Sequence, residues 1–156
     1  MKKLSRRDLL TGTALFGTVP ALASGCADER EHIVAEDALE EGVALIFQYP
    51  PQHEAFIVKL GRPAEGGVGP DGDIVAFHTA CPHMGCPINP AGPEQLGTGV
   101  FGPCRCHQST FDLKTSGRQI YGRATQNLVR VLIESDLGEI YAVGIEGLPF
   151  GEALKA

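Results

Sequence analysis

Two short segments of the chain combine the residue types that bind iron in proteins. One is the sequence Cys-Pro-His-Met-Gly-Cys beginning at Cys81, and the other is Cys-Arg-Cys-His-Gln-Ser beginning at Cys104. Each offers one thiolate and one imidazole, from Cys81 and His83 in the first segment and from Cys104 and His107 in the second. This is the ligand set of the [2Fe–2S] centres in which histidine replaces cysteine on one iron. We expect Cys81 and Cys104 to hold the inner iron, and His83 and His107 to hold the outer iron.

Histidine ligation changes the charge of such a centre. A neutral imidazole in place of a thiolate removes one negative charge per ligand, so the reduced cluster is penalised less and its reduction potential rises. Centres of this type span roughly −150 to +300 mV. An outer imidazole can also release a proton when the iron is oxidised, which couples electron transfer to pH. The two segments predict an electron-transfer centre, with no catalytic residue in this chain.

Two further cysteines, Cys86 and Cys106, stand at matching places in the two segments and are not needed as ligands. A disulfide that clamps the segments together is their natural use in an oxidising compartment. Two alternatives stay open. A zinc ion could use all four cysteines, although the single residue between Cys104 and Cys106 is short for a zinc pair. Two plain disulfides could also stand beside histidines that bind no metal.

With these motifs the chain resembles the Rieske iron–sulfur family, whose two cluster loops match residues 81–86 and 104–109. The resemblance implies an all-β Rieske fold, in which an antiparallel β-sandwich or barrel carries an inserted subdomain that binds one [2Fe–2S] cluster. One departure is the connection between the loops. Twenty residues separate His83 from Cys104, more than the family usually has, and residues 89–93 look like part of an enlarged connection.

The resemblance also implies roles for residues around the cluster. Ser109 occupies the position at which many members donate a hydroxyl hydrogen bond to a bridging sulfide. Phe111 stands where high-potential members carry a tyrosine that donates to a ligand cysteine. We therefore expect a positive potential below that of the tyrosine-bearing members, and an increase when Phe111 is replaced by tyrosine. Met84, Gly85 and Pro87 are expected to form an apolar tip at which a redox partner docks.

The rest of the chain is patterned as short strands. The 20 glycines and 11 prolines favour turns over long helices. Runs rich in Val, Ile, Phe and Tyr predict an all-β domain over residues 43–151, followed by a tail at 152–156. Residues 27–42 are polar and acidic, and we interpret them as a linker or a short helical turn. The expected strands cover residues 43–49, 55–60, 73–79, 99–101, 110–113, 118–121, 128–133 and 139–145.

Residues 1–26 have the features of an export signal. Four basic residues within the first seven positions precede 19 uncharged residues. The pair Arg6-Arg7 resembles a twin-arginine signal, which exports folded proteins. Cleavage near Ala23, lipidation of Cys26 and retention as a membrane anchor are all compatible with this leader. Each outcome places the folded domain in the periplasm.

The charge distribution narrows the classes of partner. The formal net charge is −6, and the first eight residues contribute +3, so the remainder carries about −9. A domain this acidic lacks the basic footprint of a nucleic-acid-binding protein.

Stretches outside the cluster loops resemble the small subunit of arsenite oxidase. These stretches are residues 57–77, 122–128 and 141–148. The resemblance implies a heterodimer with a large molybdopterin subunit that oxidises arsenite to arsenate. Electrons would pass through the cluster of this chain to a periplasmic cytochrome c or a blue-copper protein similar to azurin. Residues 122–125 would form a third loop over the cluster, and no residue of this chain would contact arsenite.

Other functions remain as alternatives. The Rieske subunit of a quinol–cytochrome c reductase would retain a membrane anchor, and Phe111 together with the proline-free loop 122–125 argues against it. An exported binding protein held together by disulfides would contain no metal, and a colourless, iron-free preparation would favour it. An oxygenase ferredoxin is a further option, although such ferredoxins are typically cytoplasmic and lack the spare cysteine pair.

Overall fold

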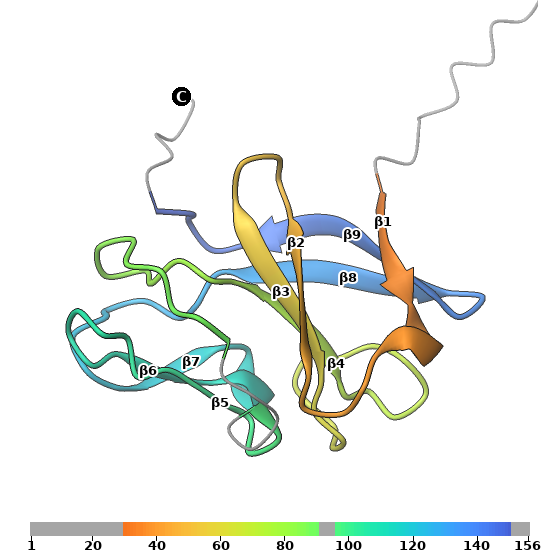
Figure 1. The fold of residues 1–156 in the computed structure, drawn as a ribbon, viewed down its shortest axis with the longest axis horizontal. Coiled ribbons are helices and arrows are strands. Elements are labelled where there is room, and N and C mark those ends of the chain that lie inside the picture. The colour runs from red at the N-terminus through yellow and green to blue at the C-terminus, as the bar shows by residue number, and fades with distance from the viewer. Residues whose placement is uncertain (1–29, 91–95, 151–156) are drawn as a thin grey trace, which may run out of the picture.

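The computed structural model describes residues 30–90 and 96–150, which form short strands and two single-turn 3-10 helices (Figure 1). The helices are η1 (Glu36–Ala38) and η2 (Leu113–Thr115). The strands are β1 (Glu31–Ala35), β2 (Ala44–Gln48), β3 (Glu54–Lys59), β4 (Ile74–His78), β5 (Val100–Phe101), β6 (Thr110–Asp112), β7 (Arg118–Tyr121), β8 (Arg130–Asp136) and β9 (Glu139–Glu146).

The strands form two antiparallel sheets. The larger sheet has six strands in the order β1-β9-β8-β4-β3-β2, and the smaller has three in the order β5-β6-β7. Strands β4 and β8 are neighbours in the larger sheet, although residues 79–129 separate them in sequence. These residues form the inserted subdomain, which contains the smaller sheet and both cysteine-rich loops (Figure 1). The predicted all-β fold, an antiparallel sheet that carries an inserted subdomain, is confirmed.

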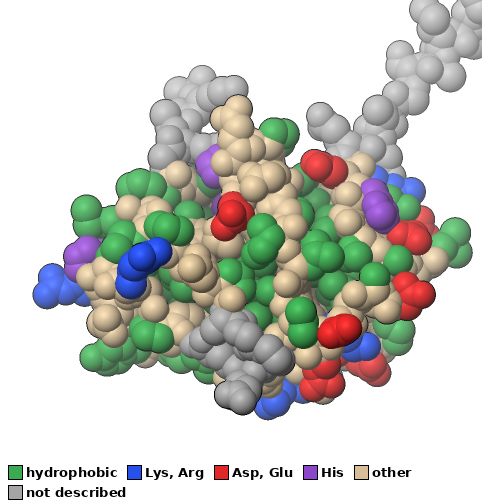
Figure 2. All heavy atoms as spheres, viewed as in Figure 1, with side chains coloured by type: hydrophobic (Ala, Val, Ile, Leu, Met, Phe, Trp, Pro, Cys, Tyr) green, Lys and Arg blue, Asp and Glu red, His purple; other side chains and the backbone are tan. Residues whose placement is uncertain are grey.

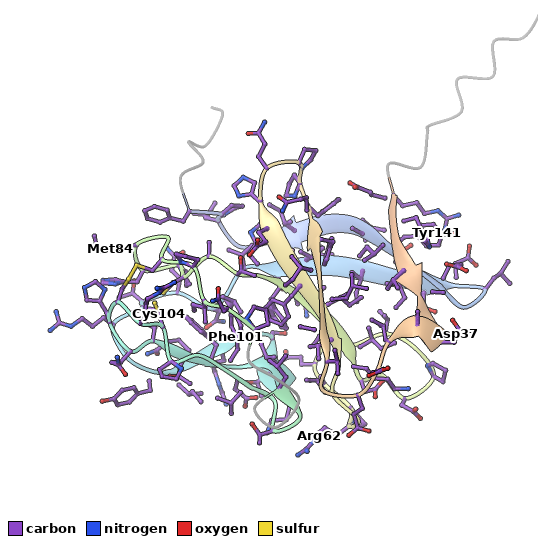
Figure 3. The ribbon with its side chains drawn as sticks, in the orientation of Figure 1. Asp37, Arg62, Met84, Phe101, Cys104 and Tyr141 are labelled. Atoms are coloured by element: carbon purple, nitrogen blue, oxygen red, sulfur yellow. A yellow bond between two sulfur atoms is a disulfide. The ribbon has the colours of Figure 1, made fainter. Side chains whose placement is uncertain are left out.

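The core anchors the inserted subdomain to the larger sheet. Strand β3 is buried on both faces because it lies between two hydrophobic clusters. The cluster on the side of the inserted subdomain contains Phe56 of β3, Phe101 of β5 and Phe111 of β6, together with Cys81 and Cys104. The rings of Phe56 and Phe101 lie 4.6 Å apart between centroids, a favourable aromatic contact across the two sheets (Figure 3). The first residue of each cysteine-rich loop, Cys81 or Cys104, is therefore packed in the core.

The strand predictions hold with one omission. Strand β7 has the predicted bounds, and most others agree within one or two residues. Strand β8 begins later than expected, at Arg130, and continues to Asp136. The interpretation of residues 27–42 as a linker was wrong for residues 31–35, which form β1 and pair with β9.

The predicted leader and C-terminal tail lie outside the described residues. Within residues 30–90 and 96–150, no helix is long and apolar enough to cross a membrane.

Candidate iron–sulfur centre

The two cysteine-rich loops share one backbone scaffold. In the first loop, the amide of Cys81 donates to the carbonyl of Cys86 at 2.9 Å, and the amide of Gly85 donates to the carbonyl of Cys81 at 2.8 Å. In the second loop, Cys104 takes the place of Cys81: its amide donates to the Ser109 carbonyl at 2.8 Å, and its own carbonyl accepts from the Gln108 amide at 2.8 Å. The residue four positions after each first cysteine has a positive φ, +70° at Gly85 and +62° at Gln108. The loops thus share one turn, but the histidine stands two residues after Cys81 in the first loop and three residues after Cys104 in the second.

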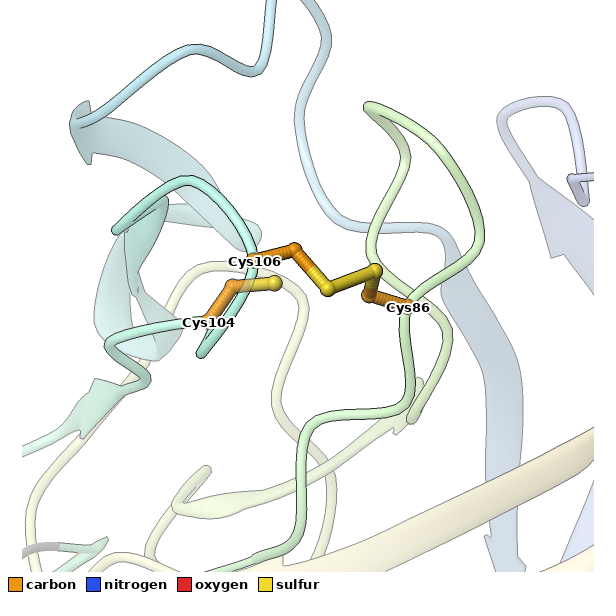
Figure 4. Close-up of side chains that lie close together, drawn as sticks. All are labelled: Cys86, Cys104 and Cys106. Carbon is orange, nitrogen blue, oxygen red and sulfur yellow. A yellow bond between two sulfur atoms is a disulfide. The ribbon is translucent and has the colours of Figure 1, made fainter.

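A disulfide joins the two loops. Cys86 and Cys106 are bonded to each other, with their Cα atoms 6.5 Å apart (Figure 4). This pairing confirms the disulfide predicted from the sequence. The sulfurs of Cys86, Cys104 and Cys106 lie within 4.8 Å of one another, but two of them are oxidised and cannot serve as thiolate ligands. A zinc ion held by four cysteines is therefore excluded.

Cys81 and Cys104 remain as free thiols, and each is only 1% exposed. Burial raises the pKa of the Cys81 thiol above its usual value, and the neighbouring Cys104 side chain raises it further. Hydrogen bonds from the His83 amide and the Ser109 side chain oppose this rise. A buried thiolate is costly without a nearby positive charge, and bound iron supplies that charge. The two thiols are therefore suited to bind a cation from inside the protein.

His83 and His107 face each other at the outer side of the same site. Their Nδ1 atoms lie 3.1 Å apart, and the ring planes are nearly perpendicular, at 88°. Both rings are partly exposed. Two facing ring nitrogens from different loops fit ligation of one outer metal ion by both histidines. Within each predicted pair the side chains meet, the Cys81 and Cys104 thiols in the core and the His83 and His107 imidazoles where both rings are partly exposed. That all four bind one cluster stays a prediction.

Ser109 connects the second loop to the loop at residues 122–125. Its side chain is fully buried, and its Oγ accepts a hydrogen bond from the Ala124 amide at 3.0 Å. The hydroxyl hydrogen is then available to donate to sulfur, which agrees with the hydrogen bond between Ser109 and the Cys81 side chain. Because Ala124 belongs to the expected third loop, this hydrogen bond shows that the third loop lies against the second cluster loop.

Phe111, also fully buried, has no hydroxyl and cannot donate a hydrogen bond to a cysteine.

The family comparison decides which kind of centre these residues form. Residues 31–143 match the family model described as "Rieske [2Fe-2S] domain". The chain belongs to the Rieske [2Fe-2S] family. It therefore carries a Rieske-type [2Fe–2S] cluster, for which the two buried thiols and two partly exposed imidazoles are a suitable ligand set. The alternative of a metal-free protein held together by disulfides is wrong.

Within the Rieske family, the chain is similar to two curated subunits and to a solved structure. The chain is 39% identical to the iodate reductase subunit IdrB of Pseudomonas sp. (strain SCT) over 92% of this chain and 74% of the relative. It is 44% identical to IdrB of Denitromonas iodatirespirans over 72% of this chain and 60% of that relative. The soluble domain of the Rieske protein II from Sulfolobus acidocaldarius superposes with a TM-score of 0.62 at 25% identity, over 74% of this chain and 77% of that chain. Both curated relatives are named as subunits of iodate reductase.

The remaining histidines are not part of the Rieske site. His78 is buried, and its Nε2 lies 2.8 Å from the Tyr49 carbonyl oxygen, so it is a packing residue. His53 stacks on His78, with ring centroids 5.5 Å apart. His32 belongs to β1 rather than to a linker, and it pairs with Glu139 at 2.6 Å.

Loss of the Ser109 hydroxyl is expected to lower the reduction potential of the Rieske cluster. A hydrogen bond that favours the more negative, reduced state by about 1.4 kcal/mol raises the potential by about 59 mV. In Ser109→Ala we expect a decrease of about 60 mV, and in Phe111→Tyr an increase of similar size. Protein-film voltammetry measures both values. Thr110→Ala is the matched control, since the Thr110 hydroxyl donates to the Gln108 carbonyl instead. Unchanged potentials in both variants would refute this assignment.

Gly122 permits the third loop to approach the second cluster loop. Its φ is +93°, and a Cβ added there would lie 2.4 Å from the Cα of Ser109. Gly122→Ala is therefore expected to displace the loop, to reduce the free energy of unfolding by about 1–3 kcal/mol, and to shorten the cluster lifetime in air. Gly138→Ala is the matched control, because Gly138 also has a positive φ, of +82°, but no atom within 4 Å of the added Cβ. Equal losses of stability and of cluster lifetime in the two variants would contradict the role of this contact.

Proposed function

We propose that this chain is the electron-transfer subunit of an enzyme similar to iodate reductase. The observation that carries the proposal is the similarity to two IdrB subunits, one of them covering 92% of this chain. The site itself supports a relay, because it brings together metal ligands whose outer members are partly exposed. When bound, the cluster accepts and releases one electron at a time. The residues of the chain fix it near the surface and set its potential through groups such as Ser109.

A larger catalytic subunit is the second part of the proposal. The sequence resemblance to arsenite oxidase favours a molybdopterin protein as this partner. In an iodate-reducing enzyme, a periplasmic cytochrome c or blue-copper protein would give electrons to this chain, which would pass them to the catalytic subunit. In an arsenite-oxidising enzyme the same components would carry electrons in the opposite direction. The direction of transfer is therefore the property that separates the two substrates.

Capture of the native complex tests the partnership. A tagged form of this chain is purified from its own cells, and the co-purifying protein is identified by mass spectrometry and metal analysis. We expect a large subunit that contains molybdenum. Co-purification of a cytochrome b and a cytochrome c₁ would instead assign the chain to quinol oxidation. The 40% identity to the cytochrome bc1 Rieske subunit of Streptomyces lividans spans only 51% of this chain, which gives that alternative less support.

The same purified complex tests the direction of transfer. Iodate added to the reduced complex should oxidise the Rieske cluster, which is followed by the loss of its EPR signal. Arsenite added to the oxidised complex would produce that signal if the enzyme were an arsenite oxidase. Oxidation by iodate with no reduction by arsenite is the expected result. The reverse result would overturn iodate as the substrate and would leave the relay role intact.

Export through the twin-arginine route is also proposed, on the sequence of the leader alone. In Arg6→Lys/Arg7→Lys the protein should accumulate in the cytoplasm, whereas the unmodified protein should be found in the periplasmic fraction. Equal periplasmic amounts of the two proteins would contradict this route.

A further inference from the structure

Charge is unevenly divided between the two parts of the structure. The inserted subdomain, residues 79–129, has one acidic side chain among its described residues, Asp112. It has four basic side chains, from Arg105, Lys114, Arg118 and Arg123. The rest of the described chain has thirteen acidic side chains and only four basic ones. Figure 2 shows basic side chains and a histidine at the end of the molecule formed by the cluster loops, and most acidic side chains toward the opposite end.

Two of these arginines lie on the loops that surround the cluster. Arg105 is next to Cys106, whose disulfide joins the second loop to the first. Arg123 follows Gly122, which contacts the second loop at Ser109. Both arginines are exposed, and neither forms an ion pair with a residue in the described ranges. Their positive charges are therefore available to a partner.

Large apolar side chains are exposed on the same loops or next to them. Met84, at the tip of the first loop (Figure 3), is 58% exposed, and Tyr121, which directly precedes the third loop, is 67% exposed. Phe150 approaches the first loop so closely that a Cβ on Gly85 would lie 2.3 Å from its ring, yet it is 51% exposed. Exposed apolar groups, aromatic side chains and arginine are typical of the energetic centre of protein interfaces.

We propose that this surface, formed by Met84, Arg105, Tyr121, Arg123 and Phe150 and called here the basic tip, docks a redox partner whose face carries carboxylates around an apolar centre. The proposal rests on the proposed electron-transfer function and adds the chemistry of the partner. Two thiolates balance the charge of an oxidised [2Fe–2S] core, and reduction adds a single negative charge, so the tip stays positive in both states. The acidic remainder of the chain would at the same time repel an acidic partner that approached from another side, which orients the encounter. The carboxylate of Glu54, at the base of the first loop, accepts a hydrogen bond from Thr79.

Salt dependence of electron transfer tests the basic tip. Stopped-flow kinetics are measured from the reduced chain to an acidic blue-copper protein and to a basic cytochrome c, between about 0.01 and 0.15 M ionic strength, where the Debye length falls from about 30 to about 8 Å. We expect the rate constant for the acidic protein to fall several-fold as salt rises. The formal net charge of −6 alone would predict the opposite, a rate that rises with salt. A rise for the acidic probe would overturn the proposal.

Charge-reversal variants locate the effect. Arg105→Glu and Arg123→Glu should each reduce the rate with the acidic probe several-fold at low salt and flatten its salt dependence. Arg62→Glu changes the net charge equally at a site away from Met84 and Cys104 (Figure 3), and it should leave the salt dependence close to that of the wild type. An equal effect of Arg62→Glu would overturn the basic tip. The EPR signal and the potential of the wild type and of each variant are recorded as well. A wild type without the Rieske signal would contradict the proposed function, whereas a variant that keeps the signal and the potential but transfers electrons slowly has lost docking alone.

Discussion

Replacement of His107 by alanine is expected to abolish the Rieske EPR signal and to remove nearly all of the bound iron. Its Nδ1 lies 3.1 Å from that of His83, so the loss of either imidazole leaves the outer iron with one protein ligand. An incomplete ligand shell exposes the cluster to water and oxygen, and we expect at least a tenfold loss of cluster occupancy. His83→Ala should give the same result. Iron and sulfide analysis, together with EPR of the dithionite-reduced protein, measures this loss.

His32→Ala provides the matched control for these variants. His32 is an exposed histidine that pairs with Glu139 on the larger sheet. Its replacement should leave iron content and signal at wild-type levels. A wild-type EPR signal in His83→Ala or His107→Ala would show that the ligand assignment is wrong, because a Rieske spectrum requires both imidazoles.

Removal of the disulfide between Cys86 and Cys106 is expected to give the second largest effect. The bond closes a chain segment with a sequence separation of 20. The loop-entropy relation predicts about 3 kcal/mol for a closure of this length. Cys86→Ser/Cys106→Ser should lose about this free energy of unfolding and should also lose its cluster faster in air, because the two ligand loops are then free to separate. Urea unfolding of the holoprotein and the decay of its visible absorbance measure these two effects.

Reduction provides a test of the same bond within one protein. A phosphine reductant should destabilise the wild type and leave the double serine variant unchanged. The wild type and the variant should then have the same stability in the presence of reductant. If the two proteins unfold at the same urea concentration without reductant, the disulfide does not hold the loops together.

The features that the sequence predicts best are local ones. Ligands and disulfide cysteines occur within two segments of six residues, so their spacing alone indicates the chemistry. Runs rich in Val, Ile, Phe and Tyr predict most strands, because strands buried on one or both faces need apolar residues. Strand β3, for example, is apolar at four consecutive positions and is buried between two clusters.

The features that the sequence could not supply depend on long-range contacts. Strand β1 lies within a segment that is polar and acidic as a whole, and it is held in the sheet by pairing with β9, more than 100 residues later. The need for glycine at position 122 follows from the approach of Ser109, which has no sequence signal. In the same way, the close approach of the Phe150 ring to Gly85 cannot be predicted from the sequence around either residue. The division of charge could be counted in the sequence, but only the fold shows that the basic part surrounds the cluster.

Pulsed EPR on protein labelled with ¹⁵N-histidine tests the central claim most directly. The claim is that one [2Fe–2S] cluster is held by Cys81 and Cys104 inside the protein and by His83 and His107 at its surface. The dithionite-reduced wild type should show strong couplings from two histidine nitrogens, and both couplings should persist in His32→Ala. A reduced cluster without histidine nitrogen coupling would contradict the claim and would require a different ligand set.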